Sequence, residues 1–183
     1  MRTDTALLII DVQTGLVAGT TPVYQLDELL GNIATLIAQA RTTGTPIIYI
    51  QDNDVDAIGS PGWQIHPAIA PHEGDVVLRK PETDAFYGTT LQQEMEARGI
   101  RHLIVVGCKS EVCVDATCRR ATNLGYNVTL VSDAHSTTDN VVLTAQQTIA
   151  YHNHILQMVW SDEHGEVVGV MVKPTSETIM TMF

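Results

Sequence analysis

The chain has 183 residues, and its 10 Lys and Arg against 21 Asp and Glu give a formal net charge of −11 at pH 7. Its length and its hydrophobic content of 44% suit one globular domain, residues 1–183, with a sizeable core. The basic residues are scattered along the chain with no more than two in a row, so the sequence has no basic stripe of the kind that binds phosphate backbones or anionic membranes. We therefore expect neither nucleic acid nor membrane as a partner.

The amino-terminal region and the cysteines indicate the compartment. The first apolar run, residues 6–10, is too short for a signal peptide or a membrane span, so we expect a cytoplasmic protein. The three cysteines, Cys108, Cys113 and Cys118, lie close together but have neither a CxxC spacing nor the pattern of a zinc-ligand set. We expect all three to be reduced thiols.

Short apolar runs alternate with segments of helical period along the chain, which is typical of an α/β fold. The expected strands are 6–10, 47–50, 76–78, 103–106, 128–131 and 167–172. The expected helices between them are 26–44, 90–98, 112–125 and 140–157. Six strands with helical crossovers predict a three-layer, doubly wound and mainly parallel sheet with a Rossmann-like order. The polar stretch 51–72 is too long for a mere connection and is interpreted as a lid or pocket wall.

Three chemically reactive side chains fall at the carboxyl ends of the expected strands, where such sheets bind their ligands. Asp11 follows the first strand, Lys80 follows the third, and Cys113 lies near the start of the helix after the fourth. The positive end of that helix would favour the thiolate form of Cys113. Together the three groups could supply a base, electrostatic support and a nucleophile. Taken singly, each could instead be structural: a capping carboxylate, a surface lysine and a small buried hydrophobe.

Several stretches of the sequence carry a family resemblance. They are LIIDVQ at 8–13, SPGWQIHP at 60–67, RKP at 79–81, AFYGT at 85–89, VVGCKSEVCV at 105–114 and SDAHS at 132–136. Together they resemble the isochorismatase-like cysteine hydrolases, and the similarity extends over nearly the whole chain. The resemblance implies the same doubly wound α/β fold.

The resemblance also implies the roles of particular residues. Asp11, Lys80 and Cys113 would form the catalytic triad, and a non-proline cis peptide would join Cys108 to Lys109. The backbone amides of Lys109 and Cys113 would then form the oxyanion hole. The implied reaction is hydrolysis of a C–N bond in a small amide, ureido or carbamoyl compound through a thioester, with Asp11 as base, acid and base again. The family's namesake lacks the nucleophilic cysteine, so Cys113 favours amide chemistry.

The family's nicotinamidases hold a metal with an Asp and histidines after the second strand. This chain has Asp52-Asn53-Asp54 at that place, so we expect no metal and no cofactor. The roles of His66 and His72 in the long loop, and of His135 after the fifth strand, stay open.

Candidate walls of the substrate pocket are Gln13, Trp63, Phe86 and Tyr87, each of which could equally serve in packing. No arginine has a clear claim on a substrate carboxylate, which favours a neutral substrate. The expected partner is therefore a small amide-type molecule. Members of the family are commonly oligomers, which implies a homo-oligomer in which the loop 51–72 serves its own site or a neighbour's.

Other enzyme classes fit the sequence less well. The G-x-S-x-G motif of serine hydrolases does not occur around Ser110, and no G-x-G-x-x-G follows the first strand to bind a dinucleotide. Two alternatives remain. One is a scaffold or binding protein that keeps the fold without amidase turnover, and the other is a nicotinamidase with a degenerate metal site.

Overall fold

A seven-stranded sheet forms the centre of the computed structural model, which describes residues 4–161 and 167–181. The strands are β1 (Thr5–Ile10), β2 (Ile47–Asp52), β3 (Val76–Lys80), β4 (His102–Cys108), β5 (Asn127–Ser136), β6 (Met158–Ser161) and β7 (Val167–Lys173). Their order in the sheet is β3-β2-β1-β4-β5-β7-β6, and only the β6–β7 pair is antiparallel. The strand order reverses between β1 and β4, so a ligand site is expected beyond the carboxyl ends of these two strands.

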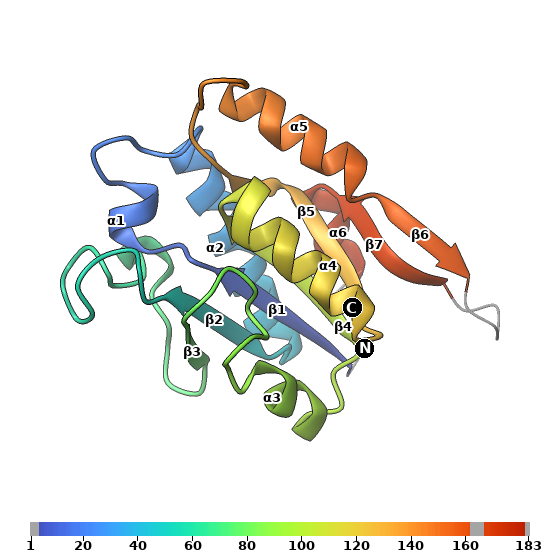
Figure 1. Cartoon of the computed structure of the whole chain (residues 1–183). Helices are drawn as coiled ribbons and strands as arrows, with labels where there is room; N and C mark the ends of the chain where they lie inside the picture. The colour runs from blue at the N-terminus through green and yellow to red at the C-terminus, as the bar shows by residue number, and fades with distance from the viewer. Residues whose placement is uncertain (1–3, 162–166, 182–183) are drawn as a thin grey trace.

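Helices cover both faces of the sheet, as Figure 1 shows, with α3, α4 and α5 on one face and α2 and α6 on the other. The helical elements are α1 (Thr14–Val17), α2 (Leu26–Thr43), the 3₁₀ turn η1 (Pro67–Ile69), α3 (Leu91–Ala97), the π-helical turn η2 (Ser110–Val114), α4 (Asp115–Asn123), α5 (Ala145–Ile155) and α6 (Thr175–Thr181). No helix within the described ranges has both the length and the apolar character needed to cross a bilayer.

The central strand β1 shows why the sheet is buried on both sides. Every residue from Thr5 to Ile10 is buried. Leu8 and Ile10 pack with the α3 and α4 side, whereas Leu7 and Ile9 pack with the α2 side. Because side chains alternate along a strand, a parallel strand between two helical layers must be apolar at every position.

The predicted fold class is confirmed, but the number of strands is corrected from six to seven. The stretch 140–157 is not one helix, because α5 begins only after a capping box formed by Thr144 and Gln147 and ends at Ile155. The four residues of β6 then pair with β7 and end the sheet. A strand of four residues is too short to show a period of its own, and the short helices α1 and α6 escaped prediction for the same reason.

Candidate active site

Asp11 lies where the chain leaves the central strand β1. Its backbone adopts a left-handed conformation with φ of 51°, and its N–H donates to the carbonyl of Ile50 at 3.0 Å. A positive φ is uncommon outside glycine and is tolerated best by Asp and Asn. The residue is fully buried, so its carboxylate must have partners inside the protein.

Lys80 provides the cation that this carboxylate needs. It is the last residue of β3 and is fully buried. Its Nζ lies 2.9 Å from Oδ2 of Asp11 and 3.4 Å from Sγ of Cys113, and it also donates to Oδ2 of Asp52. The structure therefore brings together the three side chains that the sequence places at separate strand ends, and it adds Asp52 as a second carboxylate.

The cysteine arrives from the turn after β4. Gly107 there has φ of 120°, and a Cβ at this position would lie 2.0 Å from the carbonyl oxygen of Ile10, so only glycine lets β4 approach β1 so closely. The cis peptide expected between Cys108 and Lys109 is present. Cys113 follows in η2 and is 7% exposed.

Burial determines the protonation states of the site. Burial raises the pKa of Asp11 to about 6, although the charge of Lys80 opposes this shift. Burial, and next the charge of Asp11, raise the pKa of the Cys113 thiol to about 12. Burial also opposes the charge of Lys80, but the carboxylate of Asp11 and its other neighbours raise the Lys80 pKa above its ordinary value.

The expected thiolate at Cys113 is therefore wrong for the unliganded site. The favourable helix position does not offset the loss of solvent around the sulfur. At neutral pH the site holds a thiol beside an ionised carboxylate, which is a proton donor next to a base.

The same four residues bear on metal binding. One donor atom from each of Asp11, Asp52 and Cys113 lies within 4.8 Å of the others, as in a metal-ligand set. The ammonium of Lys80 contacts all three side chains. These donors thus already share a cation, and a metal ion would have to displace it. The position of Asp52 at the carboxyl end of β2, in register with Lys80, is the sequence signal for its part in the site.

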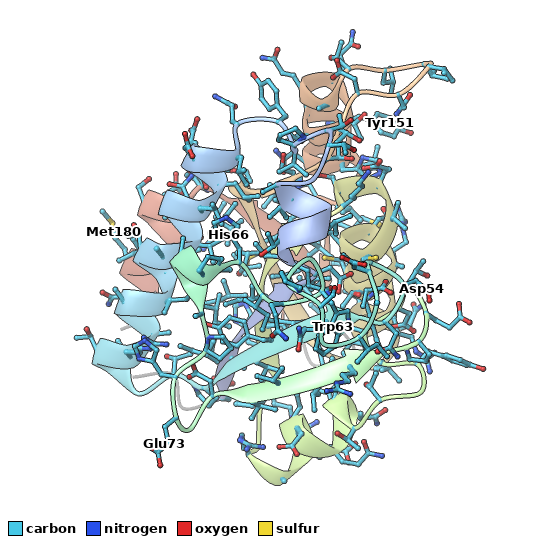
Figure 2. All side chains as sticks on the ribbon, turned by 90° about the vertical axis from the view of Figure 1, so that its left-hand side faces the viewer. Asp54, Trp63, His66, Glu73, Tyr151 and Met180 are labelled. Atoms are coloured by element: carbon cyan, nitrogen blue, oxygen red, sulfur yellow. The ribbon has the colours of Figure 1, made fainter. Side chains whose placement is uncertain are left out.

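A pocket of about 280 Å³ opens beside Cys113 at this edge of the sheet. Its lining consists of Asp11, Gly15, Leu16, Asp52, Asp54, Val55, Lys109, Val112 and Cys113. Figure 2 looks onto this end of the molecule, with Trp63 near its centre and Asp54 to the right. The wall thus combines aliphatic residues with carboxylates, and Lys109 is part of the lining.

None of the four predicted pocket residues is part of the lining of this pocket. Gln13 is fully buried: its Nε2 donates to the carbonyls of Asp52 and Trp63, and its Oε1 accepts from the N–H of Asp52 at 2.8 Å. Trp63 donates from Nε1 to the same Asp52 carbonyl at 3.0 Å. Phe86 packs in the core, and Tyr87 is 65% exposed. Gln13 and Trp63 thus hold the backbone of Asp52 in place.

The long loop 51–72 packs against its own chain. Gly15 donates its N–H to the carbonyl of Gly62 at 2.7 Å, and Gln13 forms a bridge with Ile65. This loop therefore supports the pocket of its own chain.

The two loop histidines make local contacts outside the pocket lining. His66 accepts from the N–H of Ala68 at 3.3 Å and caps η1, and Nε2 of His72 lies 3.1 Å from Nη1 of Arg41.

Known proteins resemble this chain in sequence and in fold. A streptothricin hydrolase of Streptomyces noursei is 41% identical over an alignment of 138 residues that covers 73% of this chain and 50% of that protein. A second streptothricin hydrolase of the same organism is 38% identical and is covered to 55%. The chain thus spans about half the length of these curated relatives. A ureidoacrylate amidohydrolase of Variovorax paradoxus is 28% identical, over 72% of this chain and 68% of that protein.

Solved structures with a similar fold point to the same family as the sequence relatives. An isochorismatase of Pseudomonas putida is 30% identical, with a TM-score of 0.83 over 96% of this chain and 90% of that one. The sequence model of the isochorismatase domain matches residues 5–157. With this match over most of the chain, and with the Asp-Lys-Cys group in place, the protein belongs to the isochorismatase domain family.

Proposed function

We propose that the protein is a cysteine-dependent hydrolase that cleaves a C–N bond of a small amide, ureido or carbamoyl compound. The observation that carries the proposal is the buried Lys80 ammonium, which contacts both the Asp11 carboxylate and the Cys113 thiol beside an open pocket. A relative named as a ureidoacrylate amidohydrolase and two named as streptothricin hydrolases support this reaction class.

In the proposed first half-reaction, Asp11 accepts the thiol proton of Cys113 while the sulfur attacks the substrate carbonyl. The backbone amides of Lys109 and Cys113 stabilise the oxyanion. Asp11 then gives its proton to the departing nitrogen as the C–N bond breaks, which leaves an acyl group on the sulfur as a thioester.

In the second half-reaction, Asp11 deprotonates a water molecule that attacks the thioester carbonyl. The C–S bond breaks, the carboxylic or carbamic acid leaves, and the proton returns to the sulfur of Cys113. One carboxylate thus serves both halves of the cycle.

The electrostatics of the site suit these proton transfers. With a pKa of about 6, Asp11 is ionised about ten to one at pH 7, yet it is basic enough to accept a proton. When Asp11 becomes protonated, Lys80 keeps the carboxylate of Asp52 as its counter-ion. The buried ammonium therefore never loses all of its partners during the cycle.

Turnover of a substrate panel tests the proposal. Streptothricin, ureidoacrylate, N-carbamoyl amino acids, simple amides and nicotinamide are incubated with the protein, and products are followed by mass spectrometry and ammonia release. We expect turnover that is lost in Cys113→Ala and kept in the matched variant Cys118→Ala, whose sulfur is buried in α4. Turnover that persists in Cys113→Ala would refute the mechanism, and no turnover on any compound would favour the scaffold alternative.

We also propose that residues 1–183 act as one domain in a homo-oligomer. Large apolar side chains are exposed at Val141, Val142 and Tyr151, and Figure 2 shows Tyr151 on α5 at the outside of the molecule. Such a group is typical of a surface that a second copy covers. Sedimentation velocity at micromolar concentration should show a species larger than the 19.9 kDa chain, and a monomer would contradict this proposal.

A further inference from the structure

A chain of hydrogen bonds begins at Ser110 in η2, is buried at that end, and has no part in the mechanism above. Oγ of Ser110 lies 2.8 Å from Nδ1 of His135, and Nε2 of His135 lies 2.9 Å from Oδ1 of Asn153. The Nδ2 of Asn153 then donates to the carbonyl of Ser132 at 3.1 Å. Ser110 is 0% and His135 is 3% exposed. The chain thus connects the turn that carries Cys113 to β5 and α5.

The direction of each hydrogen bond follows from its partners. Asn153 uses its amide nitrogen on the Ser132 carbonyl, so its oxygen accepts and Nε2 of His135 carries the hydrogen. Nδ1 of a neutral imidazole is then an acceptor, and the hydroxyl of Ser110 donates to it. Burial lowers the pKa of His135 to about 4, so the ring stays neutral throughout the physiological range.

Ser110, His135 and Asn153 have the composition of a Ser-His-Asn triad, but their placement excludes that role. The hydroxyl of Ser110 is fully buried, and the residue is outside the lining of the pocket beside Cys113. A nucleophile must reach the substrate carbonyl, so Ser110 cannot attack from this position. The hydrogen-bond network therefore has a structural role.

The neighbours of Ser110 show what the network holds. Lys109 donates from Nζ to Thr138 at 3.1 Å, and Thr137 donates to the carboxylate of Glu111 at 2.8 Å. Three consecutive residues, 109–111, are thus bonded to the segment 135–138. Of these three bonds, the one from Ser110 to His135 is buried. In the sequence, Ser110 lies between Lys109, whose amide is part of the proposed oxyanion hole, and Cys113.

We propose that His135 is a positioning residue of the active site: it holds the Ser110 hydroxyl and thereby fixes the turn that presents the Cys113 thiol and the Lys109 amide. The inference rests on the proposed function and deepens it. His135 is outside the lining of the pocket beside Cys113, and its side chain bonds Ser110 and Asn153, so its effect on the active site must pass through Ser110.

Two substitutions of the same histidine separate its two hydrogen bonds. In His135→Asn the amide lies near the place of Nδ1 and can still accept from Ser110. In His135→Gln the longer side chain reaches the place of Nε2 and can still donate to Asn153, but Ser110 loses its acceptor. If His135 acts through Ser110, His135→Asn should keep more of the Cys113 reactivity and of the turnover than His135→Gln.

The first readout needs no substrate. The alkylation rate of Cys113 by iodoacetamide is measured on the folded proteins by peptide mass spectrometry. We expect a fall of at least about tenfold for His135→Gln and for Ser110→Ala, and little change for His135→Asn. Adding Ser110→Ala to His135→Gln should cause no further loss, because both remove the same hydrogen bond.

The second readout is turnover on any active substrate of the panel. A displaced nucleophile lowers kcat much more than it changes KM, and a shift of about 1 Å can cost about 10²-fold. His102→Gln is the matched control, because its Nε2 pairs with Oγ1 of Thr129 at 2.8 Å at the opposite end of β4. It should leave both readouts unchanged.

Three results would overturn the inference: a His135→Gln variant that reacts at the wild-type rate, equal losses in His135→Asn and His135→Gln, or an equal loss in His102→Gln. The alkylation readout keeps this test separate from the proposed function. Turnover that survived in Cys113→Ala would refute the hydrolase mechanism, while the rates of alkylation would still decide whether His135 positions the thiol.

Discussion

The substitution Asp11→Asn tests whether Asp11 is the base that activates Cys113. The pKa values of about 12 for the thiol and about 6 for the carboxyl differ by about six units. At about 1.4 kcal/mol per unit, this gap sets an upper limit of about 8 kcal/mol on moving the proton from sulfur to carboxylate before attack, because protonation of Asp11 removes the charge that raises the thiol pKa. A preformed thiolate is therefore rare, and the proton must move as the new bond to sulfur forms.

Asparagine keeps the shape of the side chain but removes the base. We expect the alkylation rate of Cys113 at pH 7 to fall by about 10²–10⁴-fold, the usual contribution of a general base. A purely electrostatic role of Asp11 would give the opposite result, because the charge of Asp11 is, after burial, the largest cause of the high thiol pKa. If Asp11 only raised this pKa, the variant would react faster than the wild type.

The pH dependence provides a second signature of the base. In the wild type the rate should rise about tenfold per pH unit below pH 6 and level off above it, as Asp11 loses its proton. The rise near pH 6 should vanish in Asp11→Asn. The control Asp27→Asn lies in the exposed first turn of α2 and should behave as the wild type.

The assay is iodoacetamide labelling between pH 4.5 and 9, with quantification of the peptide that contains Cys113. Cys108 and Cys118 are completely buried and should stay unlabelled in the folded protein. An Asp11→Asn variant that reacts as fast as the wild type at pH 7, or that keeps the rise near pH 6, would refute the assignment.

The remaining predictions concern the surroundings of Asp11. Lys80→Met should lower the free energy of unfolding by about 3–5 kcal/mol in urea titrations, because Asp11 loses its buried counter-ion; an unchanged midpoint would contradict this. Asp52→Asn removes a charge that raises the pKa of Asp11, so the pH profile of Cys113 alkylation should move to lower pH. A shift of this profile to higher pH would contradict the prediction. Gly107→Ala should cost more than about 3 kcal/mol in thermal unfolding, because its Cβ would clash with Ile10, whereas the wild-type melting temperature would show that the strands can separate.

The meeting of Asp11, Lys80 and Cys113 could be predicted from the sequence because it depends on topology alone. Lys80 ends a strand and the other two residues lie just beyond one, and parallel strands bring their carboxyl ends to one edge of the sheet. The cis peptide after Cys108 came from the family resemblance and is also present. These features survive large changes in loop geometry.

The pocket walls and the protonation state could not be predicted in this way. Gln13 follows Asp11 by two residues and looks like a substrate contact, but its polar atoms are used on the backbone of Asp52 and Trp63. The pKa of Cys113 depends on how much solvent the folded protein removes, which the helix position alone does not reveal. Both properties arise from packing between segments that are distant in sequence.

The central claim is that Cys113 forms a covalent acyl intermediate. Intact-protein mass spectrometry after rapid quenching of a turning-over mixture tests it most directly. The account predicts a transient adduct with the mass of the acyl group, located on the peptide of Cys113 and absent from Cys113→Ala. Turnover that proceeds with no adduct, and at the same rate in Cys113→Ala, would contradict it.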